Sequence, residues 1–289
     1  MEISKNTNLK ALLNRYKITP AKIRGQNFLI SEKVLAQIVN AAELSKEDIV
    51  LEIGPGVGTL TRELCIRTGF VVAVENDPQF SQIINDISEE FKNLKVYYQD
   101  ILKFDLNLIG DSASIFKRST SGLSYKVVAN IPYNITSEIL IKFLQSNLQP
   151  KYLVLMVQKE VAERILERDG KSSRLSIFVN YFGKPEIIAH VPAACFWPKP
   201  KVDSAILKIV THNGFYQNNL DKQKDFFELV KLGFISPRKK LLSNLCKKIK
   251  RDLLIQAFDR TGISSNARPE NLNFSAWRNL FDNIRYYSK

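Results

Sequence analysis

The sequence predicts an α/β fold, with a Rossmann-like, mostly parallel sheet followed by a smaller all-helical C-terminal domain. Short runs rich in β-branched residues alternate with amphipathic segments, which is the pattern of βαβ units with helices on both faces of a sheet. From about residue 215 onward the periodic segments are all helical. We therefore expect one domain over residues 1–212 and a second over residues 213–289.

Five strand-like runs form the expected parallel sheet, and each is bounded by Gly, Asp or Asn. They cover residues 48–54, 70–76, 94–100, 125–131 and 151–157. Amphipathic helical patterns separate the first three of these runs, at residues 59–69 and 78–91. Two later runs, 186–192 and 204–212, flank the proline-rich "FWPKPKVD". We expect these two to pair antiparallel at one edge of the sheet.

The remaining segments are a loop, a leading helix and the C-terminal helices. Residues 105–125 contain Gly, Ser and Thr and are predicted to form a long loop. The first residues carry scattered basic side chains and no apolar core segment, so a surface helix is expected rather than a secretory signal. In the C-terminal part, helices are expected within residues 223–235, 239–249, 251–262 and 275–284.

The composition is that of a globular protein with an ordinary core, because 45% of the residues are hydrophobic. No apolar run approaches the ~20 residues that span a bilayer, so no membrane segment is expected. Cys65, Cys195 and Cys246 lie far apart and lack the spacing of metal ligands. We therefore expect no metal site, inert thiols and a reducing, cytoplasmic setting.

The positive charge is concentrated near the C-terminus. The formal net charge is +13, and residues 211–289 carry 15 Lys and Arg against 7 Asp and Glu. The preceding 210 residues carry 27 against 22. Lys and Arg side chains that neutralise phosphates release bound counterions, so a basic module favours a polyanionic partner. A basic surface without such a partner is the alternative that charge alone leaves open.

A glycine-rich loop follows the first strand in "EIGPGVGTLT", with Gly54, Gly56 and Gly58. Glycines at this point let the backbone approach a nucleotide, and an acidic residue that ends the second strand can bind both ribose hydroxyls. Glu75 has that position. A dinucleotide fingerprint would need a third glycine where this chain has Thr59. The pattern therefore predicts a nucleoside ligand at the carboxyl ends of the strands.

The fourth strand ends in an unusual way, in "KVVANIPYNITS". Pro132 cannot donate to a sheet ladder and restricts Ile131 before it, so the strand must end here. A turn does not require an amide and an aromatic residue as its neighbours. Asn130 and Tyr133 are therefore candidates for binding or catalysis.

Eight motifs, in order, resemble those of the small-subunit ribosomal RNA adenine dimethyltransferases of the KsgA type. These enzymes have a class I methyltransferase fold and use S-adenosylmethionine. The motifs are "GQNFL" at 25–29, "EIGPGVGTLT" at 52–61, "VEND" at 74–77, "QD" at 99–100, "NIPYNITS" at 130–137, "VQKEVAERI" at 157–165, "FWPKPKVDSA" at 196–205 and "RPENLNFSAWRNL" at 268–280.

The resemblance implies a set of site residues. The S-adenosylmethionine contacts of the family fall on Asn27, Leu29, Gly54, Glu75, Asp100 and Asn130. The catalytic segment falls on Asn130, Ile131, Pro132 and Tyr133, with Phe196 as a second aromatic. The Asn130 side-chain oxygen and the Ile131 carbonyl would accept the two hydrogens of an adenine amine. Tyr133 would stack on one face of the base, and Phe196 would close over the other.

The implied reaction is dimethylation of two adjacent adenosines near the 3′ end of small-subunit ribosomal RNA. The implied partner is that RNA in a pre-ribosomal 30S-type particle, bound by a monomer. RNA phosphates would contact the basic residues Arg238, Lys239, Lys240, Lys247, Lys248, Lys250 and Arg251. Pro237 replaces the first arginine of a family motif in "FISPRKKLLSNL". Since proline is tolerated at a first helical position, a helix is expected to restart there.

Two alternatives remain. Large-subunit rRNA methyltransferases that give macrolide resistance share the Asn-Ile-Pro-Tyr segment, but Gly-Pro-Gly and "RPENL" favour the small-subunit type. Proteins related to this family also act as mitochondrial transcription factors, which bind nucleic acid with or without methyltransferase activity. The intact cofactor motifs and the lack of a transit-like extension argue against that alternative.

Overall fold

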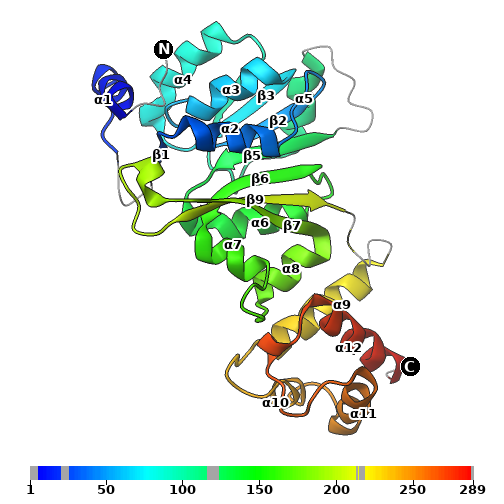
Figure 1. The fold of residues 1–289 in the computed structure, drawn as a ribbon. Helices are drawn as coiled ribbons and strands as arrows, with labels where there is room; N and C mark the ends of the chain where they lie inside the picture. Colours follow the sequence, from blue (N-terminus) through cyan, green and yellow to red (C-terminus); the bar gives the residue numbers. More distant parts are fainter. Residues whose placement is uncertain (1–5, 21–25, 116–123, 213, 215–218, 288–289) are drawn as a thin grey trace. The chain divides into compact units, whose positions relative to one another are not determined.

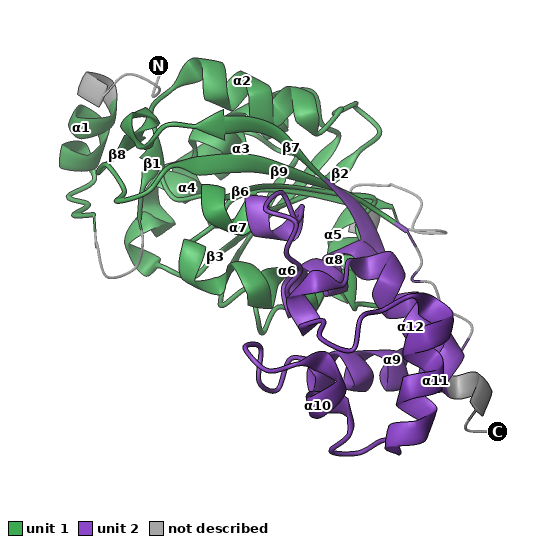
Figure 2. Ribbon diagram, turned by 60° about the horizontal axis from the view of Figure 1, so that its bottom comes forward, with its two compact units in different colours: residues 1–162, 186–211 green, residues 163–185, 212–289 purple. Residues whose placement is uncertain are grey.

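The computed structural model describes residues 6–20, 26–115, 124–212, 214 and 219–287 (Figure 1). The chain divides into two compact units (Figure 2). The first comprises residues 1–162 and 186–211, and the second comprises residues 163–185 and 212–289. Residues 163–185 thus group with the C-terminal part, whereas they were predicted to belong to the first domain. The separate functions of the two domains stay a prediction.

The first unit is built on a mixed sheet that has seven strands among the described residues, in the order β4-β3-β2-β5-β6-β9-β7. Neighbouring strands from β4 to β6 pair in parallel, and β9 runs antiparallel to β6. The predicted α/β fold is therefore confirmed. The strands are β2 (Ile49–Ile53), β3 (Phe70–Glu75), β4 (Leu94–Tyr98), β5 (Tyr125–Asn130), β6 (Tyr152–Gln158), β7 (Gly183–Val191) and β9 (Ser204–Thr211).

Helices cover both faces of this sheet. Apolar side chains of three helices join one core cluster with those of β2, β3, β5, β6 and β9. These helices are α2 (Glu32–Ala41), α3 (Thr59–Arg67) and α4 (Ser81–Glu90). On the opposite face lies α6 (Thr136–Leu144) (Figure 1). Because both faces are covered, every residue of β2 and β3 is buried, which explains their continuous apolar sequences.

A small second sheet lies beside the large one. In it, β1 (Phe28–Leu29) pairs antiparallel with β8 (Phe196–Trp197), so that Leu29 faces Phe196. The Ile30 backbone N–H also donates to the Cys195 carbonyl, at 2.9 Å. The segment after the leading helix α1 (Asn6–Arg15) is therefore attached to the link between β7 and β9. That link does join neighbouring strands at an edge of the large sheet, as predicted.

Within the second unit, helices pack around aromatic side chains. The helices of this unit are α8 (Arg174–Phe182), α9 (Leu220–Gly233), α10 (Leu241–Leu245), α11 (Arg251–Thr261) and α12 (Phe274–Tyr287). The helix α7 (Lys159–Ile165) begins in the first unit and ends in the second. The Tyr181 ring lies 5.5 Å from Phe226 and 4.8 Å from Phe227. Tyr181 is itself fully buried. Large aromatic side chains give a small helical unit most of its apolar burial.

Three local predictions are wrong. The predicted loop 105–125 contains α5 (Asn107–Ile115), and residues 116–123 lie outside the described part of the chain. The helix predicted over 239–249 is only α10, so several of the lysines lie in the turns that flank it. Pro237 does not restart a helix, because it lies in the turn between α9 and α10.

Candidate functional site

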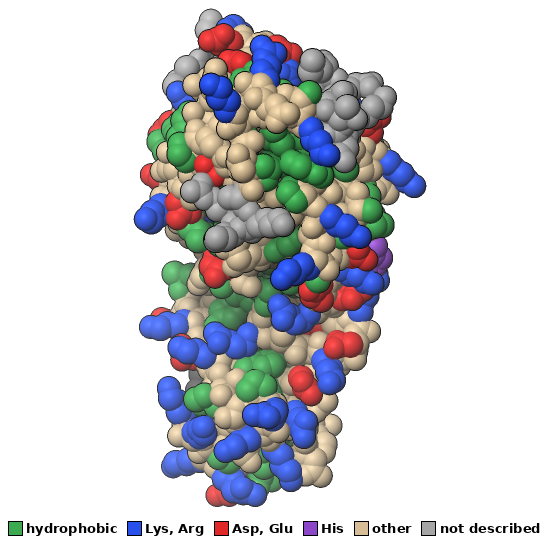
Figure 3. All heavy atoms as spheres, turned by 90° about the vertical axis from the view of Figure 1, so that its left-hand side faces the viewer, with side chains coloured by type: hydrophobic (Ala, Val, Ile, Leu, Met, Phe, Trp, Pro, Cys, Tyr) green, Lys and Arg blue, Asp and Glu red, His purple; other side chains and the backbone are tan. Residues whose placement is uncertain are grey.

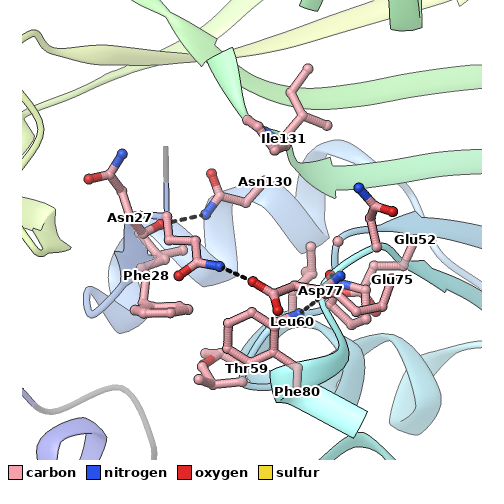
Figure 4. Close-up of a pocket in the computed structure, with 18 of the residues that line it drawn as sticks. Asn27, Phe28, Glu52, Thr59, Leu60, Glu75, Asp77, Phe80, Asn130 and Ile131 are labelled. Carbon is pink, nitrogen blue, oxygen red and sulfur yellow. Dashed lines mark hydrogen bonds between the residues drawn. The ribbon is translucent and has the colours of Figure 1, made fainter. Parts of the chain in front are cut away.

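A cavity of about 620 Å³ opens at the carboxyl ends of the parallel strands in the first unit (Figure 4). Open α/β sheets bind their ligands at this edge. All but one of the residues predicted for the site line the cavity. They are Asn27, Leu29, Gly54, Glu75, Asp100, Asn130, Ile131, Pro132 and Tyr133.

The loop after β2 depends on glycines with left-handed backbone angles. Gly54 has φ +66° and Gly58 has φ +80°. A Cβ atom on Gly58 would lie 2.1 Å from Cδ1 of Ile87, so the loop packs there directly against α4. A Cβ atom on Gly54 would meet nothing within 4 Å, because this glycine faces the cavity. Gly54 therefore leaves room for a ligand close to the backbone.

Glu75 ends β3 and holds the two neighbouring loops in place. Its Oε2 accepts a hydrogen bond from the Gly56 N–H at 3.0 Å, and its Oε1 accepts one from the Asp77 N–H at 2.8 Å. Burial raises the pKa of this carboxyl, and the backbone N–H donors partly oppose that rise. Since a carboxylate has about four acceptor positions, Glu75 keeps acceptor capacity for a ligand.

Asp77 connects the segment that leads into β1 with the segment that follows β3. Its Oδ2 accepts hydrogen bonds from Gln26 Nε2 at 2.7 Å and from Gln79 Nε2 at 2.8 Å. Asp77 is only 7% exposed. Gln26 and Asp77 belong to the "GQNFL" and "VEND" motifs, but no role was predicted for either. Gly25, the first residue of the "GQNFL" motif, lies outside the described residues.

Asn130 projects from the end of β5 and is oriented by the same segment. Its Nδ2 donates to the Asn27 carbonyl at 3.1 Å (Figure 4). This bond identifies the donor end of the amide, and so it leaves Oδ1 as the end that can accept hydrogens from a ligand. The Asp100 carboxylate, two residues beyond β4, accepts from the Leu102 N–H at 2.9 Å. Both side chains are therefore positioned before any ligand binds.

Tyr133 begins the short helix that follows Pro132 and is fixed at both ends. Its carbonyl accepts a hydrogen bond from Thr136 Oγ1 at 3.0 Å. Its hydroxyl lies 2.5 Å from the hydroxyl of Ser204, the first residue of β9. Burial raises the pKa of the phenol, although the Ser204 hydrogen bond opposes this. Tyr133 therefore presents a neutral ring to the cavity.

Phe196 is the predicted site residue that does not line the cavity. It is 2% exposed and belongs to the core cluster of the first unit, opposite Leu29 in the β1–β8 pair. The aromatic residues that do line the cavity include Phe28 and Phe80, whose ring centroids are 5.9 Å apart. These two phenylalanines were not predicted. They provide an apolar wall, on which a nucleobase can be buried.

Glu52 is an acidic site residue that was not predicted from the sequence. It lies on the fully buried β2, lines the cavity and is 1% exposed. Burial raises the pKa of its carboxyl to about 8. Its Oε2 has no hydrogen-bond partner among the described residues. The sequence did contain a signal for this residue, because Glu52 is the one charged residue in the apolar run "IVLEI". Charged residues are seldom buried without a role.

The chemistry of these groups suits a nucleoside-type ligand. One apolar-walled cavity is lined by the glycine-rich loop, by the acceptors Glu75 and Asp100, and by Glu52, whose Oε2 lacks a partner among the described residues. No cluster of three His, Cys, Asp or Glu side chains that could hold a metal occurs in the described part of the chain.

The predicted basic residues of the second unit are all exposed. Among the described residues, no carboxylate lies within salt-bridge distance of any of them, although Lys222 and Lys231 nearby are paired with Asp282 and Glu228. Lys and Arg side chains clearly outnumber acidic ones on this part of the surface (Figure 3). The unpaired group is Arg238, Lys239, Lys240, Lys247, Lys248, Lys250 and Arg251. We call it the basic cluster.

The sheet order, the glycine loop and the cavity together define a class I methyltransferase fold, and solved rRNA methyltransferases share it. The 23S rRNA methyltransferase ErmE superposes with a TM-score of 0.73 at 27% identity, covering 90% of this chain and 100% of that one. A dimethyladenosine transferase from Plasmodium falciparum superposes with a TM-score of 0.72 at 26% identity, covering 90% and 98%.

Sequence comparison defines the family. The model of the ribosomal RNA adenine dimethylase family matches residues 21–285, and the chain belongs to this family. A ribosomal RNA small subunit methyltransferase A from Dehalococcoides mccartyi is 37% identical over 277 residues, covering 94% of this chain and 90% of the relative. The enzyme of the same name from Clostridium botulinum is 38% identical over 280 residues, covering 96% and 98%.

No helix in the described parts of the chain has both the length and the apolar character needed to cross a membrane.

Proposed function

We propose that this protein uses S-adenosylmethionine to dimethylate the exocyclic amines of two adjacent adenosines near the 3′ end of small-subunit ribosomal RNA. One observation carries the proposal. Asn130 and Tyr133 line the same cavity as Glu75 and the glycine loop, so a base-binding segment and a nucleoside-binding segment share one space. The names of the sequence relatives support the choice of the small subunit.

The cofactor would be held by the residues that line the cavity at the strand ends. Glu75 would accept hydrogen bonds from the ribose hydroxyls, and Asp100 and Leu29 would contact the adenine. Gly54 would lie against the methionine part, and Asn27 and Asn130 would separate the two ligands. When bound, S-adenosylmethionine supplies an electrophilic methyl group on its sulfonium.

The protein contributes mainly positioning and hydrogen bonding at the target base. An adenine amine is a poor nucleophile, because its lone pair is delocalised into the ring. The Oδ1 of Asn130 and the carbonyl of Ile131 would accept the two amine hydrogens and so keep electron density on the nitrogen. Tyr133 would stack on the base, which must leave its own stack to enter the cavity. The methylated amine is acidic enough to lose its proton without a strong base.

We further propose that the substrate is a 30S-type particle in the cytoplasm, and that a monomer binds it. Two bases must enter one pocket in turn, so the protein has to hold the surrounding RNA. Folded RNA is recognised largely through its shape and phosphates. The exposed, unpaired basic cluster supports such a role for the second unit. Phe196 is the weakest of the proposed catalytic residues, because its side chain is buried away from the cavity.

Primer extension tests the proposal. Small-subunit particles that lack the modification are incubated with the protein and S-adenosylmethionine, and the blocked adenosines are mapped. Two adjacent stops near the 3′ end of the RNA are expected, because dimethylation removes the pairing face of the base. The Asn130→Ala variant should give none. Stops in large-subunit RNA would indicate the macrolide-resistance type, and no transfer to either RNA would favour a nucleic-acid-binding factor.

A further inference from the structure

The hydroxyl groups of Tyr133 and Ser204 form a hydrogen bond between two segments 71 residues apart in the chain. Their oxygens are 2.5 Å apart, and Ser204 is 0% exposed. A buried hydroxyl needs a partner, since water cannot reach it. For Ser204 that partner is the tyrosine at the wall of the cavity.

The backbone of Ser204 is held firmly, so its hydroxyl can fix the position of the Tyr133 ring. It pairs with Gln158 across the β6–β9 ladder. The preceding residue, Asp203, is fixed as well, because its Oδ1 accepts from the Ala193 N–H at 2.8 Å and its carbonyl accepts from the Lys159 N–H at 3.0 Å. The Ser204 backbone therefore has little freedom to move.

The opposite end of the tyrosine is fixed by the chain itself. Pro132 restricts the backbone before Tyr133, and Thr136 Oγ1 bonds to the Tyr133 carbonyl after it. With the backbone held at one end and the hydroxyl at the other, rotation of the side chain is restricted. A ring held in this way loses less conformational freedom when a base stacks on it.

We propose that Ser204 is a positioning residue for methyl transfer, whose hydroxyl holds the Tyr133 ring in the plane that the target base requires. This inference rests on the proposed function, because it assigns Tyr133 to the base. Ser204 does not itself touch the substrate. It acts through the tyrosine, which explains why a buried serine begins β9 directly behind the catalytic segment.

A double-mutant cycle tests the inference. We compare wild type, Ser204→Ala, Tyr133→Phe and the double variant in single-turnover methylation of small-subunit particles. Each single change removes the hydrogen bond and keeps the ring, so each should slow transfer by ~3- to 10-fold. The double variant should be no slower than the slower single variant. The affinity for S-adenosylmethionine, measured by calorimetry, should change less than about twofold in all of them.

The same unit offers a matched control. Tyr97 and Ser112 form another hydroxyl pair at 2.7 Å, and Ser112 is 1% exposed, but neither residue lines the cavity. Ser112→Ala should lower the melting temperature about as much as Ser204→Ala and leave the transfer rate unchanged.

Three outcomes would overturn the inference. Ser204→Ala could transfer methyl groups at the wild-type rate, the two single effects could multiply in the double variant, or Ser112→Ala could slow transfer as much as Ser204→Ala. A wild-type protein that methylates no ribosomal adenosine would instead refute the proposed function, and with it this inference.

Discussion

Replacing Gly54 with alanine should change both the free energy of unfolding and the affinity for the ligand, and a second glycine allows the two effects to be separated. Gly54 has φ +66°, and Gly262, the C-cap of α11, has φ +67°. At both positions an added Cβ would meet no atom within 4 Å. The remaining cost is the left-handed backbone, ~1–2 kcal/mol for a residue with a Cβ. Gly54→Ala and Gly262→Ala should therefore lower the free energy of unfolding by similar amounts.

The two variants should differ in ligand binding, because only Gly54 lines the cavity. Its new methyl group would occupy space that we assign to S-adenosylmethionine. Inserting a methyl group into a packed contact costs ~1–3 kcal/mol. That range corresponds to a roughly 5- to 150-fold weaker Kd, at 1.4 kcal/mol for each factor of ten.

Urea unfolding and calorimetric titration with S-adenosylmethionine measure the two effects on the same samples. We expect equal shifts of the unfolding midpoint and a loss of affinity in Gly54→Ala alone. Equal affinities in the two variants would refute the placement of the cofactor against this glycine. A much larger loss of stability in Gly54→Ala would refute the argument that the space beside it is open.

Three further predictions concern the cavity and the basic cluster. Glu75→Ala should weaken S-adenosylmethionine binding by a few kcal/mol, because hydrogen bonds to a charged group contribute ~1.5–3 kcal/mol each; unchanged affinity by calorimetry would contradict its role at the ribose. The Glu52 carboxyl keeps its proton in the folded state up to about pH 8, but in the unfolded chain it loses the proton near pH 4.5. The free energy of unfolding of the wild type should therefore fall, relative to that of Glu52→Gln, as the pH rises from 4.5 to 8. Urea midpoints across that range measure this, and parallel curves for the two proteins would show that Glu52 is ionised in the fold. Four lysines of the basic cluster can be changed to Glu together: Lys239, Lys240, Lys247 and Lys248. This change should raise the apparent KM for small-subunit particles and flatten its salt dependence without changing the affinity for S-adenosylmethionine. The control reverses four exposed lysines of the first unit, Lys33, Lys92, Lys95 and Lys151, and an equal effect there would place RNA docking on that unit.

The sequence predicted the strands of the parallel sheet to within two residues. A strand covered on both faces needs an uninterrupted apolar run, and such runs are easy to recognise. The helix ends were harder to predict. The lysines after α10 fit an exposed helix face and an exposed turn equally well, so the pattern could not show where α10 ends. In the same way, the Gly and Ser residues within α5 are as typical of a loop as of a short helix.

The sequence by itself determined that residues at the strand ends would meet at one cavity, because parallel neighbouring strands bring their carboxyl ends to one edge. Gly54, Glu75 and Asn130 follow from that rule alone. Only the tertiary structure decided that Ser204 bonds to Tyr133, and that Phe196 is buried beside Leu29 of β1. These contacts join segments far apart in the chain. Their distances depend on how separate layers pack, and local periodicity carries no information about that packing.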